Sequence, residues 1–542
     1  MAIQVSPGVV FTEIDLSQYA ARISTSIVGL VGGAEKGPIN TPTYITNELQ
    51  LVQTFGEPIS TVSGDSDSAV SYMSHAALQY LRNGNQLWVV RVADEDGGTP
   101  AAAATVMLQA TAVDILKVDA LTKGEWANQA SATCNEGIKV VTTDPSNSNV
   151  TNAKDISIYF MGALVEKYAN VTFGTANEGV TNSEYNDLLT NAEDVINGTS
   201  TYVTVTNQIS GSTVPDGTDA SPDTSLMTTG KNGITGLVDA DYVGTINVAT
   251  GARSGLKVFE EVDTLDINLI AVPGETDAAA VRTALLSTAE TRADCLAVID
   301  PPFGLTPAKA VDFANGEGDY AADSSINSSY AALYWPWVKY YDGYNQENSW
   351  TPPSGWVLSQ MAFNDRVADP WQAPAGLNRG RLSSALSIEL TTSLGERELL
   401  YGNGNVVNPI VDFANDGITI WGQKTTQRIA SALDRVNVRR MMLYAEKVIA
   451  TSIRFLVFEP NDPITWRRFI GVVTPVLEGI KARRGITKFQ VICDSSTNTE
   501  TLINQNVMKG IILIQPTKTA EVLSIDFTLL ATGAQFQEFT QN

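Results

Sequence analysis

The residues best suited to specific contacts are basic side chains on two predicted helices between positions 434 and 484. Cationic groups gathered on one side of a helix can dock onto an acidic partner. Charge patterning alone favours an ordinary solvated face, and a docking face is the second interpretation. The candidates are Arg439, Arg440, Arg467, Arg468, Lys481, Arg483 and Arg484.

The spacing of apolar residues predicts the two helices that carry these side chains. Pro460 ends the first helix, and Asp462 occupies the N-cap position of the second. Pro463 takes the first helical position, where the missing N–H costs nothing. Pro475 falls inside the second helix, and its ring would press on the carbonyl of Gly471, so we expect a kink or a break there. The apolar stripes are Val438, Met441, Ala445, Val448, Ser452 and Leu456, then Trp466, Ile470, Val473, Leu477 and Ile480.

No combination of residues in the sequence points to catalysis. The chain has one histidine, His75, inside a predicted helix, and a lone histidine is more often structural than catalytic. The glycine-containing loops at 316–319 and 402–405 lack the lysine of a phosphate-binding loop. Paired carboxylates of a glycosidase are not excluded, but nothing singles out a pair. We therefore expect a protein that is not an enzyme and that has no cofactor and no metal site.

Charge is distributed unevenly along the 542 residues, whose net charge is −24. Residues 401–542 carry 15 basic and 12 acidic side chains, a net charge of +3, so this part alone is basic. An acidic chain is a poor nonspecific ligand for nucleic acid, so we expect no direct nucleic-acid binding.

The beginning of the sequence lacks the pattern of a signal peptide, and no apolar run is long enough to span a membrane. The three cysteines, Cys134, Cys295 and Cys493, have neither metal-ligand spacing nor an even count.

Both ends of the chain contain a predicted strand, and the one in residues 1–22 has no hairpin partner nearby. Residues 1–22 contain β-branched and aromatic residues after a Pro-Gly pair, and 521–530 alternate apolar and polar residues. A lone strand must join the edge of a sheet, either in its own chain or in a neighbouring one, and composition does not choose between them. The apolar residues concerned are Val5, Val9, Val10, Phe11, Ile14, Val522, Leu523, Ile525, Phe527 and Leu529.

The remaining pattern predicts a mixed α/β and α+β multidomain protein. Strands and helices alternate in 23–95 and again in 246–400, which is typical of a mostly parallel sheet with helices on its faces. Between them, residues 96–245 are rich in Ser, Thr, Asn, Asp and Gly, with short strands, and predict a β-rich insertion. The insertion fits a passive decoration or a receptor- or glycan-binding module.

Aromatic residues concentrate in 330–376, as in a core or a subunit contact. A sugar-stacking platform is the less favoured alternative.

Several short sequence motifs resemble the tail sheath proteins of contractile-tailed bacteriophages. The resemblance covers the first 95 residues and the chain from about 265 onward; we find none in the insertion. The motifs are S-P-G-V-V at 6–10, A-V-P-G at 271–274, R-A-D-C-L-A-V-I-D-P-P at 292–302, N-V-R-R at 437–440, F-E-P-N-D at 458–462 and V-I-C-D at 491–494.

The resemblance implies a division of the chain into five parts. Residues 1–22 would be an N-terminal arm that pairs with an adjacent subunit, and 531–542 a C-terminal tail. The discontinuous core domain would comprise 23–95 and 246–400, with 96–245 as an outer insertion domain. Residues 401–530 would form an inner α+β domain, completed by exchanged terminal strands.

The resemblance also implies a structural function. The chain would polymerise as stacked hexameric rings around an inner tail tube and contract to drive the tube through the host envelope during genome delivery. Implied partners are the chain itself, the tube protein, and baseplate and tail terminator proteins, without membrane insertion. The protein would be part of the virion, assembled in the host bacterial cytoplasm. Alternatives are the sheath of a bacteriocin or type VI secretion-like machine, and a glycan-binding or glycan-cleaving surface protein.

Overall fold

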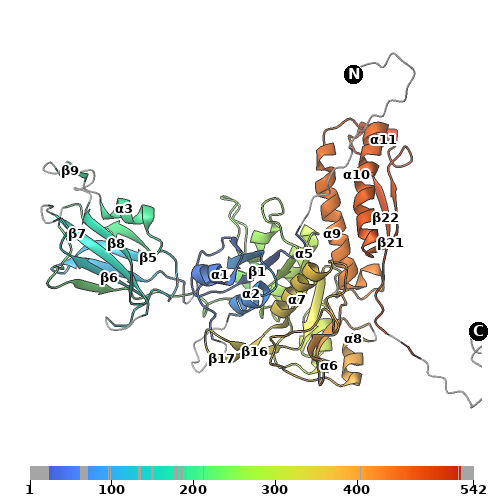
Figure 1. The fold of residues 1–542 in the computed structure, drawn as a ribbon, viewed down its shortest axis with the longest axis horizontal. Coiled ribbons are helices and arrows are strands. Elements are labelled where there is room, and N and C mark those ends of the chain that lie inside the picture. The colour runs from blue at the N-terminus through green and yellow to red at the C-terminus, as the bar shows by residue number, and fades with distance from the viewer. Residues whose placement is uncertain are drawn as a thin grey trace, which may run out of the picture. The chain divides into compact units, whose positions relative to one another are not determined.

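The protein is described by a computed structural model in which the chain divides into two compact units (Figure 1). The units are Met1–Glu459 and Pro460–Asn542. The described residues are 24–60, 71–95, 97, 99–131, 136–147, 150, 152–174, 181–182, 187–188, 191–211, 213–402, 404–522 and 524–525. No helix in these ranges is long and apolar enough to cross a membrane.

The first unit is built on an eight-stranded sheet. Its six central strands are parallel, and the two edge strands run antiparallel to their neighbours. The inner strands are continuous apolar runs, as expected when both faces of a parallel sheet are covered. In spatial order the strands are β2 (Thr43–Ile45), β3 (Leu87–Arg91), β1 (Val28–Gly32), β13 (Leu269–Ala271), β14 (Leu296–Ile299), β15 (Ala331–Trp335), β19 (Val407–Phe413) and β20 (Gly417–Ile420).

Helices cover both faces of this sheet and form a hydrophobic core on each. Successive residues of β14 alternate between the two cores: Leu296 and Val298 join one, Ala297 and Ile299 the other. The first core includes residues of α1 (Glu48–Phe55), α2 (Met73–Leu81) and α7 (Pro353–Val367). The second includes residues of α5 (Ala279–Arg292), α6 (Pro307–Asn315) and α8 (Leu394–Tyr401). The predicted mixed α/β class is confirmed.

The β-rich insertion consists mainly of two antiparallel sheets around a core of their own. The first sheet contains β4 (Thr105–Ala110), β5 (Val113–Ala120) and β11 (Val203–Asn207), and the second β6 (Ile138–Thr143), β7 (Ala153–Phe160), β8 (Ala163–Thr172) and β12 (Asp223–Leu226). The short pair β9 (Thr181–Asn182) and β10 (Asp187–Leu188) and helix α3 (Ala192–Thr199) accompany them. The return to the core includes α4 (Asp239–Val243) and the 3₁₀ turn η2 (Gly255–Glu260).

Arg91 joins the insertion to the large sheet. Its fully buried guanidinium donates to the carbonyl oxygens of Gly37 and Lys123, each at 2.7 Å, and of Asn232 at 2.8 Å. These carbonyls belong to the core and to two separate segments of the insertion, so one side chain fixes the junction.

The aromatic-rich region supplies mostly core residues. Trp335, Trp337, Trp356 and Trp371 are buried, while Trp350 is partly exposed.

A three-stranded sheet follows β15 and contains β16 (Val338–Asp342), β17 (Glu347–Thr351) and β18 (Ser387–Ile388). The large sheet then continues through β19 and β20, beyond residue 400, where we expected the core domain to end, because β19 pairs in parallel with β15. The five-part division stays a prediction.

The last long helix of the first unit is α9 (Val436–Ile453). It is preceded by the 3₁₀ turn η4 (Ala432–Asp434) and followed by η5 (Arg454–Leu456); η3 (Gly318–Tyr320) lies earlier in the chain. The predicted apolar stripe is correct as far as Val448, since Val438, Met441, Ala445 and Val448 are all buried. The predicted end of the helix at Pro460 is wrong, because α9 ends at Ile453.

The second unit contains α10 (Pro463–Ala482), β21 (Ile486–Ile492), α11 (Glu500–Asn504) and β22 (Ile511–Pro516). Asp462 caps α10 as predicted: its carboxylate accepts from the backbone N–H of Ile464 at 3.0 Å and of Thr465 at 2.8 Å. Of the expected kink or break at Pro475, the break is wrong, because α10 is continuous, and the kink stays a prediction. Pro475 and Gly471 both lie on the exposed side, where solvent can reach the carbonyl that proline leaves unpaired.

Candidate assembly surfaces

The second unit carries a pair of strands with open edges. β21 and β22 pair antiparallel, with Phe489 opposite Ile514 and Val491 opposite Ile512. Within the part of the chain that the structure describes, no further strand joins either one. Outer edges of this kind present unpaired N–H and C=O groups to any extended segment that approaches.

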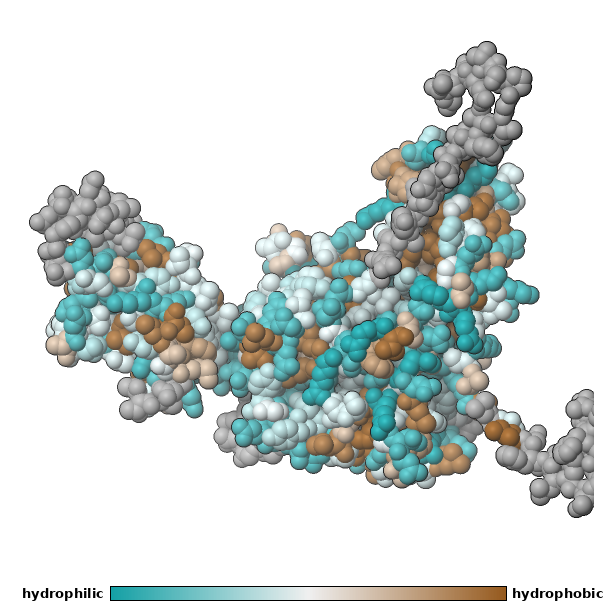
Figure 2. Space-filling view, in the orientation of Figure 1, coloured by the Kyte–Doolittle hydropathy of each residue, from teal (hydrophilic) through white to brown (hydrophobic). Residues whose placement is uncertain are grey.

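This strand pair leaves much of its apolar surface uncovered. Ile511, Ile512 and Ile514 are only partly buried, and Leu513 is 52% exposed. Figure 2 shows hydrophobic surface over the region of β21 and β22. A two-stranded sheet is marginally stable alone, and additional strands on its edges would cover this surface.

Helix α10 packs against the strand pair and supplies the core of the unit. Trp466, Phe469, Val473, Leu477 and Ile480 are buried along one side of the helix. Gly510, just before β22, lies so close to the ring of Phe469 that a Cβ atom there would come within 2.6 Å of two ring carbons. Position 510 therefore requires glycine.

The predicted arm residues are only partly within the described chain. Val5, Val9, Val10, Phe11, Ile14, Leu523, Phe527 and Leu529 lie outside it. Val522 is 86% and Ile525 70% exposed, and neither is in a strand. Two large apolar side chains thus follow β22 without cover from the rest of the described chain.

Five of the seven basic candidates are exposed on the second unit: Arg467, Arg468, Lys481, Arg483 and Arg484. Arg467 and Lys481 lie about 21 Å apart along α10 and about 40° apart around its axis, so they share one side of the helix. Exposed Glu478 lies on the same side between them. The basic groups therefore occupy the two ends of α10 rather than one compact patch.

The other two candidates, Arg439 and Arg440, are buried, so the prediction that they face a partner is wrong. The Arg439 guanidinium lies 3.4 Å from the ring centroid of Tyr330, where cation and π-face attract. Arg440 donates to the Asp365 carboxylate at 2.6 Å, and side chains of both are almost fully buried. The partners come from segments far away in sequence, so helical charge patterning gave no sign of them.

His75 is held inside the first unit by two hydrogen bonds. It is fully buried, with Nδ1 2.7 Å from the Tyr340 hydroxyl and Nε2 2.7 Å from the carbonyl oxygen of Ile59. A carbonyl only accepts, so Nε2 carries the proton and Nδ1 accepts from Tyr340. Burial lowers the pKa of His75. Among the described residues, no three His, Cys, Asp or Glu side chains are grouped to hold a metal.

Comparison with known proteins gives matches over about half of the chain. A family model for the phage tail sheath protein central domain matches residues 249–426, and one for the phage tail sheath C-terminal domain matches 430–529. The tail sheath protein of Enterobacteria phage T4 is 31% identical over 296 residues, 52% of this chain and 45% of that protein. The chain thus spans just under half the length of that relative.

Solved structures share the fold over most of the chain. The sheath tail protein of Listeria innocua aligns with a TM-score of 0.57 and 14% identity, over 92% of this chain and 94% of that one. The sheath of an extracellular contractile injection system, in a contracted state, aligns with a TM-score of 0.52 and 15% identity, over 97% and 98% of the two chains.

Proposed function

Because this chain belongs to the phage tail sheath protein family, we propose that it is the structural sheath subunit of a contractile phage tail. Copies of the chain polymerise as hexameric rings, stacked helically around an inner tube. Contraction of the sheath drives the tube through the host envelope. The protein acts as part of the virion, after assembly in the bacterial cytoplasm, with tube, baseplate and tail terminator proteins as its partners.

The observation that carries this proposal is the open-edged pair β21 and β22. No other strand of the described chain pairs with its edges, its apolar side chains are half-covered, and exposed Val522 and Ile525 follow β22. Strand addition from a neighbouring copy satisfies both the edges and the tail. Residues 1–22 and the segment around 521–530 are the arms that make these pairings.

Exchanged strands explain how a sheath remains connected while its subunits move. Backbone hydrogen bonds between an arm and a neighbour's sheet persist during rotation if the linkers at about 15–22 and after Leu530 absorb the change in angle. The chain contains no combination of residues for hydrolysis that we can identify. The energy of contraction is therefore stored at assembly, in an extended lattice that is kinetically trapped above the contracted one.

The exposed basic residues of α10 and of the turn that follows it dock the sheath onto its tube. Single exposed ion pairs contribute about 0–1 kcal/mol each, weak enough to break one after another as the sheath contracts. The docking groups are Arg467, Arg468, Lys481, Arg483 and Arg484; Arg439 and Arg440 are excluded by their burial.

Electron microscopy with sedimentation, on the full chain with and without its cognate tube protein, tests the proposal. Hollow tubes or ring stacks are expected, at least on the tube template. A variant with both Val522→Asp and Ile525→Asp should keep the wild-type melting temperature, because both side chains are exposed, and should not assemble. Val248→Asp, at a side chain 98% exposed, is the matched control and should assemble normally. A wild-type chain that stays monomeric even with the tube protein contradicts the proposal.

The same observations also fit the sheath of a contractile injection machine that is not a phage tail. The likeness to the injection-system sheath extends over nearly the whole chain, beyond the region shared with the phage T4 protein. Identification of the structural proteins that copurify with the native particle decides between the two: a capsid and its DNA are expected for a phage tail and absent from an injection machine.

A further inference from the structure

A pocket of about 180 Å³ lies at the carboxyl ends of β1 and β13, which are parallel neighbours in the large sheet. Glu275, in the connection that follows β13, lines it. Ile234 and Leu237 form another wall and lie close to Gly33, directly after β1, where a Cβ atom would come within 3.3 Å of both. A cavity of about 150 Å³ can hold a benzene-sized molecule, so this pocket is large enough for a small organic ligand.

The connections that leave these two strands run to opposite faces of the sheet. After β1 the chain forms α1 and α2, whose residues join the first core, and after β13 it forms α5, whose residues join the second. A crevice between two strands whose connections diverge in this way is where open α/β sheets bind their ligands. The position of the pocket in the fold therefore points to a ligand independently of the residues that line it.

The Glu275 carboxylate places a negative charge in this pocket, and no ion pair within the described chain balances it. Its side chain is only partly buried, so a ligand in the pocket can reach it. The hydroxyl of buried Tyr242 interacts with the carboxylate. Burial, and then repulsion from the carboxylates of Asp277 and Asp239, raises the pKa of Glu275 to about 7. A cation in the pocket would relieve this repulsion.

Arg282 approaches this group of carboxylates, but its charge is already paired. Its guanidinium donates to the backbone carbonyl oxygen of Asp277 at 3.0 Å. The same guanidinium forms an ion pair with the Asp323 carboxylate at 2.8 Å. Arg282 therefore leaves the negative charge of Glu275 available to a ligand.

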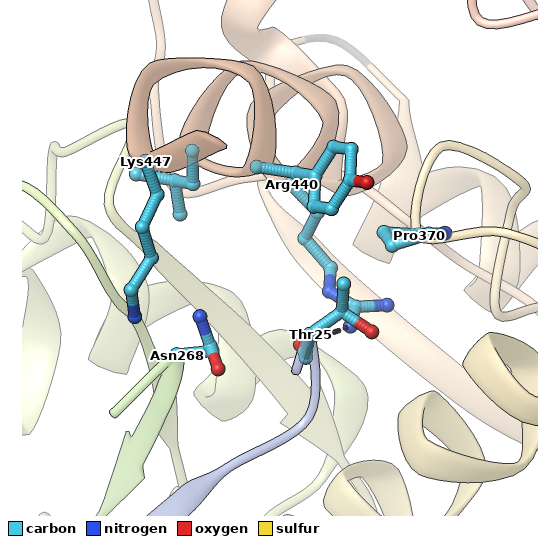
Figure 3. A pocket seen from close by; sticks show the side chains of 7 residues that line it. Thr25, Asn268, Pro370, Arg440 and Lys447 are labelled. Atoms are coloured by element: carbon cyan, nitrogen blue, oxygen red, sulfur yellow. Dashed lines mark hydrogen bonds between the residues drawn. The ribbon is translucent and has the colours of Figure 1, made fainter. Parts of the chain in front are cut away.

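The smaller pocket beneath α9 offers no comparable charge. Figure 3 shows Arg440 and Lys447 on the α9 side of it. Arg440 is paired with Asp365 and Lys447 with Asp266. Its volume of about 20 Å³ leaves room for little more than one water molecule. Of these two pockets, the one at Glu275 combines space for a ligand with a charge that the ligand can balance.

We propose that the pocket at Glu275 binds a primary alkylammonium group, either that of a free small amine or that of a lysine side chain from a second copy of the chain. The ammonium group donates to Glu275, and its alkyl chain lies against Ile234 and Leu237. A metal ion is less suited, because no three His, Cys, Asp or Glu side chains of the described residues are grouped to hold one. A quaternary ammonium ion is also less suited, because it has no N–H to donate to the carboxylate.

Titration of the unassembled full-length protein with n-butylammonium chloride, followed by thermal shift, tests the pocket independently of assembly. The titration is done at pH 8, where Glu275 is ionised. Butylammonium should raise the melting temperature saturably, beyond sodium or tetramethylammonium chloride at equal ionic strength. Glu275→Gln removes the charge and keeps the size of the side chain, and should weaken butylammonium binding by at least about tenfold. Glu398→Gln, at an exposed glutamate on α8 outside the pocket, is the matched control and should bind butylammonium normally.

Val238→Lys provides a second variant if Glu275→Gln does not fold. Val238 lines the pocket and is 58% exposed, so a lysine there supplies an ammonium group from within the chain without disturbing the core. This variant should melt at a higher temperature than the wild type and should lose the response to butylammonium. The proposal is overturned by an identical response of the wild type to butylammonium and tetramethylammonium. A full response in Glu275→Gln or, if that protein does not fold, in Val238→Lys overturns it equally.

Assembly in the presence of butylammonium distinguishes the two sources of the ammonium group, and this experiment rests on the proposed function. If a lysine of a second copy occupies the pocket, butylammonium competes and raises the protein concentration that the wild type needs to form sedimentable tubes. Glu275→Gln should not show this competition. Butylammonium binding without competition in the wild type assigns the pocket to a free amine. Failure of the wild type to assemble under all conditions instead contradicts the proposed function, and the thermal shift still reports on the pocket.

Discussion

The carboxylate of Asp300 accepts a hydrogen bond from the backbone N–H of Ser354 at 2.7 Å, which places a fully buried acid against the first turn of α7. Its other oxygen accepts from the backbone N–H of Gly274 at 3.2 Å. One side chain at the end of β14 thus joins the end of β13 to a helix N-terminus, where a negative charge is favourable. Burial nevertheless raises the pKa of Asp300 to about 7.

We expect Asp300 to make the stability of the first unit depend on pH. Its pKa is raised in the folded state, so its contribution is fully present below the unfolded pKa of about 3.8 and is lost as pH rises through about 7. Asp300→Asn should therefore reduce the loss of unfolding free energy between pH 5 and pH 8, by roughly 1.4 kcal/mol for each pH unit between pH 5 and the folded pKa of about 7. Urea unfolding of both proteins at the two pH values measures it. Asp319→Asn, at an exposed carboxylate, should leave the wild-type loss intact; the same loss in Asp300→Asn contradicts the assignment.

Gly510→Ala should destabilise the second unit. The added Cβ would lie 2.6 Å from the Phe469 ring, and displacing a buried ring typically costs about 1–3 kcal/mol. Gly471→Ala is the matched control, because no atom lies within 4 Å of its Cβ position and alanine favours a helix by up to about 1 kcal/mol. Thermal unfolding with limited proteolysis of the second unit should separate the two. A Gly510→Ala protein as stable as the wild type would show that the close approach to Phe469 is unimportant.

The sequence predicted the elements of the fold because their signals are local. The buried apolar runs of β1, β3 and β14 and the capped start of α10 at Asp462 are visible in a few neighbouring residues. The pairing of β19 with β15 is not, because it joins segments more than 70 residues apart. The large sheet consequently includes β19 and β20, which lie beyond residue 400.

The surfaces were predicted less completely, because contacts between segments far apart in the sequence decide which side chains are exposed. Helical spacing placed Arg467 and Arg468 correctly on the exposed side of α10. The same reasoning failed for Arg439 and Arg440, whose partners Tyr330 and Asp365 are brought to α9 only by the tertiary fold. Helical periodicity separates polar from apolar faces, but it does not indicate which polar face meets a buried counter-ion.

Removal of residues 1–15 should leave a folded, soluble protein that does not form tubes. The segment precedes the described chain, and all eight strands of the large sheet lie within the described residues. Assembly is lost in the strand-exchange model because the neighbour's sheet no longer receives its added strand. Sedimentation and electron microscopy measure assembly, and circular dichroism checks the fold. Normal tubes from the shortened chain would refute the proposed N-terminal arm.

Reversal of charge at Arg467→Glu and Arg468→Glu should weaken binding to the tube more than association of the sheath with itself. Both side chains are exposed on α10, and at about 0.5–1 kcal/mol for each exposed contact the double variant should bind the tube roughly tenfold more weakly. Higher salt should reduce the difference in tube binding between variant and wild type, because exposed charges are screened.

Arg454→Glu, at an exposed arginine outside the second unit, is the control for charge reversal and should leave tube binding unchanged. Cosedimentation with tubes measures docking, and sedimentation of the sheath protein alone measures self-association. Equal loss of both in the double variant would place these arginines in contacts between sheath subunits instead of at the tube.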